Sequence, residues 1–186
     1  MVAVFAALVL AVPAGAAPTV TLRLDDEFGV QKTHILCTVQ LSKTFVPGQK
    51  ILVCFFATKH GPVPKTYAVA LAVSGEVALA KIGSNGAPKV VATRKPAVLR
   101  RAAGPKLYTV GVGSALLVKG TAITCAVNRQ KIVGKNVVAV GCFKVDESKK
   151  PRPNSYGIGI TDGGAFLVHF DAKSKGTPVK IVQHGK

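Results

Sequence analysis

The chain has 186 residues, with 25 lysines and arginines against 8 aspartates and glutamates, which gives a formal net charge of +17. Hydrophobic residues make up 48% of the sequence, too many for a disordered basic tail and enough to build a buried core. The length allows one ordinary domain or two small ones, and a small module needs reinforcement to be stable alone.

The amino terminus carries an apolar segment. Residues 2–12 form an unbroken apolar run, which is followed by Pro13 and then by small residues. This pattern is typical of a secretory signal peptide, although basic residues are missing after Met1. The run is shorter than the roughly 20 residues of a membrane-spanning helix. We expect residues 1–17 to be a signal peptide; the alternative is a first strand or a buried helix.

The four cysteines point to an internal repeat. Cys37 and Cys54 lie 17 positions apart, and so do Cys125 and Cys142. When the two pairs are aligned, a downstream tyrosine segment and a Gly-x-Pro segment also align, with one or two residues inserted in the second copy. The aligned segments are Tyr67 to Leu71 with Tyr156 to Ile160, and Gly86 to Pro88 with Gly176 to Pro178. Anchors that keep the same order at nearly the same offsets predict a duplicated unit.

The repeat divides the chain into two modules, residues 18–93 and residues 106–186. Between them, residues 94–105 contain four cations, two prolines and no acid. This composition predicts an exposed connector.

Both modules are predicted to consist of strands. Residues 19–24 and 35–41 alternate between apolar and polar side chains. Residues 67–82 are rich in alanine and could form a helix, but the matching segment from Tyr156 contains glycine and β-branched residues that disfavour one. Ser74-Gly75 and Asp162 to Gly164 then supply hairpin turns.

Each copy therefore has about six expected strands, near residues 20, 37, 54, 70, 79 and 91 in the first. This predicts an all-β fold of two tandem homologous small antiparallel β-sandwich or barrel modules, each with an internal disulfide.

One face of the tyrosine strand carries minimal side chains. These are Ala68, Ala70 and Ala72 in the first copy, with Gly157 and Gly159 in the second. Such a face permits close approach. The backbone that approaches could belong to another sheet, to the other copy of the repeat or to a ligand chain, and close packing inside the protein is the favoured interpretation.

The cysteines are expected to form the disulfides Cys37–Cys54 and Cys125–Cys142, the one of three connectivities that the repeat favours. Closing a loop of this length stabilises a fold by about 3 kcal/mol when the effect is ascribed to chain entropy. The sequence has no C-x-x-C pair, and its histidines do not recur at equivalent positions. We therefore expect no metal site and no cofactor.

No catalytic signature stands out. Residues 111–114 begin like a dinucleotide-binding loop but lack its third glycine, so a tight turn is expected there. The only acidic run, Asp25 to Glu27, lacks the alternating ligands of a calcium loop and is interpreted as a solvated turn.

The excess charge is the remaining candidate for function. The loop before Tyr156 holds three cations, and the matching first-copy loop, residues 59–65, is also basic and rich in proline. The candidate polyanion-binding residues are Lys149, Lys150 and Arg152 in that loop, and Arg94, Lys95, Arg100 and Arg101 in the connector. Partners would be anionic polysaccharide, a cell-wall polymer or extracellular nucleic acid. The alternative is that the lysines only maintain solubility and protect sheet edges.

Together these features favour an exported, non-catalytic structural or binding protein of the cell envelope or extracellular matrix. The alternatives are an exported enzyme with a dispersed active site, or an inhibitor of a foreign hydrolase.

Overall fold

The computed structural model describes residues 19–43, 45–85, 87–93, 107–131 and 137–183. Regular secondary structure in these ranges consists of strands only, so the all-β prediction is confirmed. Within the same ranges, no helix is long and apolar enough to cross a membrane. The expected signal peptide at 1–17 and the connector at 94–105 lie outside the described residues.

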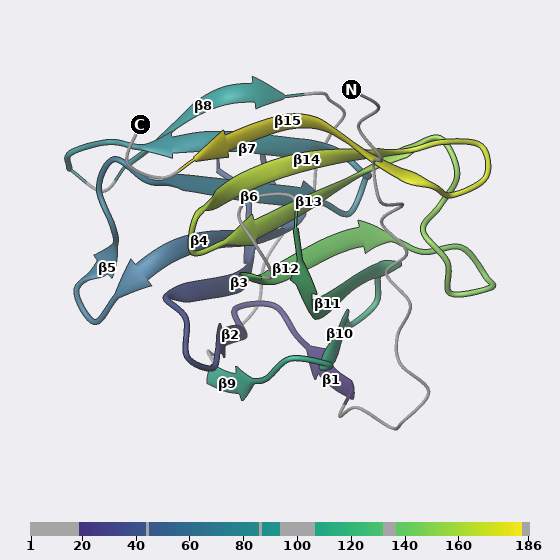
Figure 1. Ribbon diagram of the computed structural model, residues 1–186, viewed down its shortest axis with the longest axis horizontal. Coiled ribbons are helices and arrows are strands. Elements are labelled where there is room, and N and C mark those ends of the chain that lie inside the picture. The colour runs from purple at the N-terminus through teal and green to yellow at the C-terminus, as the bar shows by residue number, and fades with distance from the viewer. Residues whose placement is uncertain (1–18, 44, 86, 94–106, 132–136, 184–186) are drawn as a thin grey trace.

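The strands form two sheets (Figure 1). Sheet A has the order β1-β10-β11-β12-β13-β14-β15, and sheet B has the order β8-β7-β6-β4-β3-β2-β9, with β5 paired to β4. In the first half the strands are β1 Thr19–Leu22, β2 Glu27–Val30, β3 Ile35–Leu41, β4 Lys50–Thr58, β5 Gly61–Pro62, β6 Tyr67–Ala72, β7 Val77–Ile82 and β8 Pro88–Thr93. In the second half they are β9 Leu107–Val110, β10 Ala115–Val118, β11 Ile123–Gln130, β12 Val137–Lys144, β13 Ser155–Thr161, β14 Gly164–Phe170 and β15 Gly176–Gln183.

The first strand of each half pairs with the other half. β1 runs parallel to β10, with Thr19 opposite Ala115, and β9 runs parallel to β2, with Leu107 opposite Glu27. The prediction of purely antiparallel modules is therefore wrong, because both sheets are mixed. Two parallel neighbouring strands need a long connection between them. Here that connection includes all the remaining strands of the first half, from β3 to β8.

Three short strands were missing from the expected set: β2, β5 and β10. β2 and β10 have four residues each, and both receive their parallel partner from the other half of the chain. Each also pairs antiparallel with the strand that follows it, β3 or β11, so only the parallel half of its pairing is non-local. Four residues are the lower limit of what alternation in a sequence can identify as a strand.

The sheets pack face to face through β6 and β7 of sheet B and β13 and β14 of sheet A. One hydrophobic cluster contains residues of both sheets, including Leu71, Leu79, Ile160 and Leu167. The expected turns are confirmed, since Ser74-Gly75 joins β6 to β7, Asp162-Gly163 joins β13 to β14, and residues 111–114 join β9 to β10.

Both predicted disulfides are present, Cys37–Cys54 between β3 and β4 and Cys125–Cys142 between β11 and β12. All four cysteines lie in the shared core with at most 1% of their surface exposed. Two buried disulfides indicate an oxidising, extracytoplasmic location.

The acidic run begins in the expected turn, which extends from Arg23 to Asp26, but Asp26 is not solvated and Glu27 already belongs to β2. Its surface is only 3% exposed, and its Oδ2 accepts a hydrogen bond from the Arg23 backbone N–H (2.7 Å). The backbone carbonyl of Asp26 accepts the Val39 N–H (2.9 Å) and ties the turn to β3. Burying the carboxylate is tolerated because the turn provides it with a donor.

The face of minimal side chains lies on the outer side of each sheet, away from the common core. In the second half the glycines receive phenylalanine rings: a Cβ at Gly157 would stand 2.9 Å from Phe170, and one at Gly159 would stand 2.1 Å from Phe166. Close packing inside the protein is thus confirmed for the glycines, with rings rather than another sheet as the covering groups.

Candidate polyanion-binding surface

Two loops of the second half extend from the same end of the molecule. The first, residues 145–154, joins β12 to β13, and the second, residues 171–175, joins β14 to β15; both lie at the right of Figure 1. A backbone hydrogen bond from the Asn154 N–H to the Asp171 carbonyl (3.3 Å) connects them. We call these two loops together the basic end.

The first loop is built around Asp146. Its Oδ1 accepts hydrogen bonds from the backbone N–H groups of Ser148 (2.9 Å) and Lys150 (3.2 Å) and from the Ser148 hydroxyl (2.7 Å). The Lys149 N–H donates to the Asp146 carbonyl (3.1 Å), and Lys149 adopts a left-handed backbone with φ 61°. An aspartate that caps its own turn in this way fixes the loop locally.

The second loop repeats this design around Asp171. Its Oδ1 accepts hydrogen bonds from the backbone N–H groups of Lys173 (2.8 Å) and Lys175 (2.9 Å). Ser174 takes the left-handed position, with φ 60°. In both loops a lysine therefore lies four positions after the capping aspartate. The hydrogen bonds of the cap hold the loop backbone in this conformation without a bound ligand.

The capping hydrogen bonds also hold both aspartates in the charged form. The pKa of Asp146 lies below its ordinary value, chiefly because the Ser148 hydroxyl bonds to the carboxylate. The pKa of Asp171 is lowered in the same way, chiefly by the Lys175 backbone N–H. These carboxylates are thus held chiefly by hydrogen bonds within their own loops, and the nearby lysine charges add to the effect.

The basic end presents five exposed cations, namely Lys149, Lys150, Arg152, Lys173 and Lys175. Further hydrogen bonds hold the Arg152 backbone, since its N–H donates to the Lys144 carbonyl (2.8 Å) and its carbonyl accepts the Ser155 hydroxyl. The backbones of these two loops are held by their caps and by the hydrogen bond between them. Binding an anion would therefore require little further ordering of the loops, which lowers the entropy cost of binding.

Lys144 stands apart from this group. Its Nζ donates to the Val73 carbonyl (2.8 Å), which lies in the first-half turn between β6 and β7. Burial lowers the pKa of Lys144, and the nearby Arg152 charge adds to the effect. Lys144 therefore serves as a contact between the two halves rather than as an outward cation.

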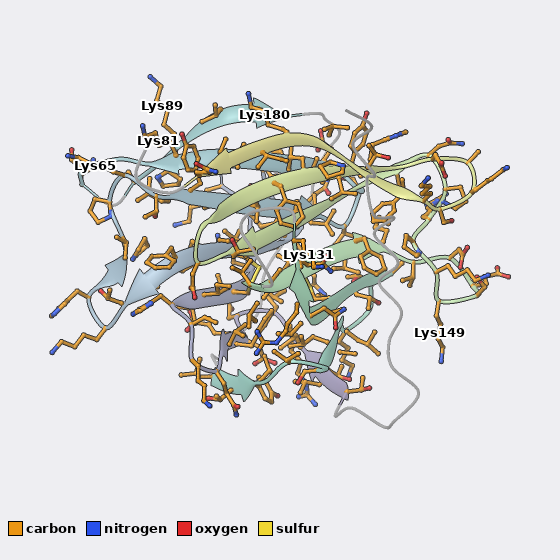
Figure 2. All side chains as sticks on the ribbon, in the orientation of Figure 1. Lys65, Lys81, Lys89, Lys131, Lys149 and Lys180 are labelled. Atoms are coloured by element: carbon orange, nitrogen blue, oxygen red, sulfur yellow. A yellow bond between two sulfur atoms is a disulfide. The ribbon has the colours of Figure 1, made fainter. Side chains whose placement is uncertain are left out.

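Of the residues predicted from the sequence, Lys149, Lys150 and Arg152 lie exposed in one loop. Arg94, Lys95, Arg100 and Arg101 lie outside the described residues. The matching first-half loop forms the β4–β5 hairpin at the opposite end of the molecule, so Lys65 and Lys149 project from opposite ends in Figure 2. The two proline-containing loops therefore do not form a common surface.

Sequence reasoning missed Lys173 and Lys175, because two lysines in a five-residue loop are not a dense basic cluster. The sequence does contain a pattern that relates this loop to the first one, namely the spacing between an aspartate and a lysine. Asp171-Ala-Lys-Ser-Lys and Asp146-Glu-Ser-Lys-Lys share an aspartate with a lysine four positions later. The shared spacing predicts the shared turn, but only the Asn154–Asp171 hydrogen bond shows that the loops are neighbours.

In the part of the chain that the structure describes, no three His, Cys, Asp or Glu side chains gather as metal ligands would. Comparison of the chain with protein-family models, with curated protein sequences and with solved structures finds no significant match.

Proposed function

We propose that this protein is an exported, non-catalytic binding protein of the cell envelope or extracellular matrix, which holds anionic polymers at its basic end. The observation that carries the proposal is the joining of two aspartate-capped loops that together expose five cations. The polymer would be an acidic polysaccharide, a cell-wall polymer or extracellular nucleic acid, which share closely spaced negative charges.

The overall charge supports the same proposal. A net charge of +17 attracts a polyanion from a distance. The cations of the two aspartate-capped loops would then provide the position at which the polyanion binds. The two disulfides are consistent with an extracytoplasmic setting where such polymers occur.

The test compares two variants that remove the same charge from different places. The basic-end variant is Lys149→Gln, Lys150→Gln and Arg152→Gln; the control is Lys59→Gln, Lys89→Gln and Lys180→Gln. All six side chains are exposed, and Lys89 and Lys180 lie far from Lys149 in Figure 2. Glutamine keeps most of the side-chain length, so the loops should retain their fold.

Binding to a duplex DNA probe, and separately to polygalacturonate and teichoic acid, would be measured over a range of salt concentrations. For duplex DNA the slope of log K against log salt should flatten by about 0.9 for each lost phosphate contact in the basic-end variant. The control should keep the wild-type slope.

Equal losses in both variants would mean that charge acts diffusely, and the proposal would then fail. Binding that does not respond to salt for any of the three polymers would leave solubility as the better explanation of the excess lysine.

A further inference from the structure

The outer face of sheet B carries a pocket of about 360 Å³ in the first half. Its floor consists of four alanines on two neighbouring strands, with Ala70 opposite Ala78 and Ala68 opposite Ala80. The residues between them, such as Val69 and Leu79, point into the common core. Alternation therefore places the alanines on the outer face.

The outer face of sheet A in the second half carries a different pair of residues at the matching positions. Gly159 and Phe166 occupy the register positions that correspond to Ala70 and Ala78. The Phe166 ring lies on Gly159, and the space left around that ring is only about 10 Å³. The second half thus fills its own outer face with a flat aromatic ring, whereas the first half covers its alanines with Phe45 and Val46 only in part and leaves a pocket beside them.

One wall of the pocket is a loop that is held by its own hydrogen bonds. The Ser42 hydroxyl accepts hydrogen bonds from the backbone N–H groups of Phe45 (3.1 Å) and Val46 (3.0 Å), and the Ser42 carbonyl accepts the Gly48 N–H (2.7 Å). Phe45 and Val46 pack on part of the alanine floor. This loop is therefore anchored beside the floor and borders the remaining space.

Polar groups border the apolar space. Asp25, Gln40 and Lys43 line the pocket together with the alanine floor. The Asp25 backbone is fixed by a hydrogen bond from its N–H to the Val39 carbonyl (2.6 Å). An open cleft of several hundred Å³ that combines an apolar floor with a few polar groups has the usual form of a small-molecule site.

We propose that this pocket binds a small amphiphile with a flat, ring-containing apolar body and a hydrogen-bonding group at one end. The flat body would lie on the alanine floor as the Phe166 ring lies on Gly159, and the polar end would meet Gln40 and Lys43. The site is separate from the basic end and does not depend on polyanion binding.

The test uses the uncharged fluorescent probe N-phenyl-1-naphthylamine, because a neutral probe is not drawn by the net charge of the protein. Titration into the full chain should give saturable binding to one site with enhanced fluorescence. Ala78→Phe places a ring where the second half has one and should weaken binding by about tenfold or more.

Two further variants keep the outcome interpretable. Ala80→Val adds only the side chain found at the corresponding Val168 and should weaken binding by a smaller factor, even if Ala78→Phe does not fold. Val179→Phe adds a ring at a site on β15 that is 54% exposed and should leave probe binding unchanged.

The Lys149→Gln, Lys150→Gln and Arg152→Gln variant should also bind the probe normally, which separates this site from polyanion binding. The proposal is overturned if the wild-type chain gives no saturable signal, or if folded Ala78→Phe and Ala80→Val bind the probe as the wild type does.

Discussion

The two halves of the molecule have the same strand order and the same disulfide spacing, yet they complete their outer faces differently. In the second half, bulk is concentrated in Phe166, which is accommodated because Gly159 opposite it has no side chain. In the first half the corresponding pair is Ala70 and Ala78, and a pocket remains. One backbone arrangement thus supports either a filled face or an open one, depending on how side-chain volume is divided between two partner positions.

The largest effect should come from breaking the glycine–phenylalanine pair. Phe166→Ala removes a ring that is 2% exposed and should destabilise the protein by about 3–5 kcal/mol. Gly159→Ala drives a methyl group into that ring and should destabilise it by about 1–3 kcal/mol. Urea unfolding of each variant measures both values.

The double variant Gly159→Ala, Phe166→Ala reproduces the alanine pair of the first half. Its destabilisation should be smaller than the sum of the single effects by about 0.5–3 kcal/mol, because the added methyl no longer meets a ring. Ala70→Gly is the matched control in the first half, where the partner position Ala78 carries no ring; it should lower the free energy of unfolding by only about 0.5–1 kcal/mol. Additive single effects would show that the ring does not rest on Gly159.

The next effect concerns the two disulfides, which test whether the halves are equally reinforced. Replacing Cys37 and Cys54 together by alanine, or Cys125 and Cys142 together, should each cost about 3 kcal/mol, because both bonds span a sequence separation of 17. Unfolding in urea measures the two losses, and mass mapping without reduction checks the pairing. A difference well above 1 kcal/mol between the pairs would mean that one half holds its strands together with less help from its disulfide.

The sequence was sufficient for the features that depend on local pattern. Alternation around Cys37 predicted β3, equal cysteine spacing predicted the disulfide pairing, and the glycines of β13 excluded a helix in both halves. Each of these rests on residues close together in the chain, or on a comparison of one half with the other.

The exchange of first strands could not be predicted, because it depends on non-local pairing. The alternation of Thr19 to Leu22 would be the same whether this strand paired with β2 or with β10. In the structure it pairs with β10, whose residues lie about 96 positions further along the chain. The same limitation hid half of the basic end, since the sequence showed Lys149 and Lys150 but not that Asp171 and its lysines lie beside them. The alanine face was visible in the sequence, but the pocket above it depends on where the Ser42 loop packs.

The smallest effect concerns the two loops of the basic end and compares their matching caps. Asp171→Ala removes the acceptor for the Lys173 and Lys175 N–H groups, and Asp146→Ala removes that for the Ser148 and Lys150 N–H groups. Each change should speed hydrogen exchange at those backbone amides while lowering the melting temperature only slightly, because both carboxylates are at the surface. Glu147→Ala, which changes an exposed neighbouring acid, is the control and should leave these exchange rates unchanged.

The pH dependence follows from the direction of the pKa shifts. Folding lowers the pKa of both aspartates below the ordinary value of 3.8. The stabilisation that the charged caps provide is therefore fully present above pH 3.8, and it is lost as the pH falls through the pKa of each aspartate in the folded protein. Amide exchange at Lys150 and Lys175, referenced to the control variant at each pH, should therefore accelerate only in strongly acid solution. Asp171→Asn keeps an oxygen acceptor without the titrating charge, so its Lys175 amide should remain protected at neutral pH and lose the acid-dependent step. An acid-dependent step that persists in Asp171→Asn would show that another group controls the loop, and the lysines of the basic end would then be positioned by something other than their aspartate caps.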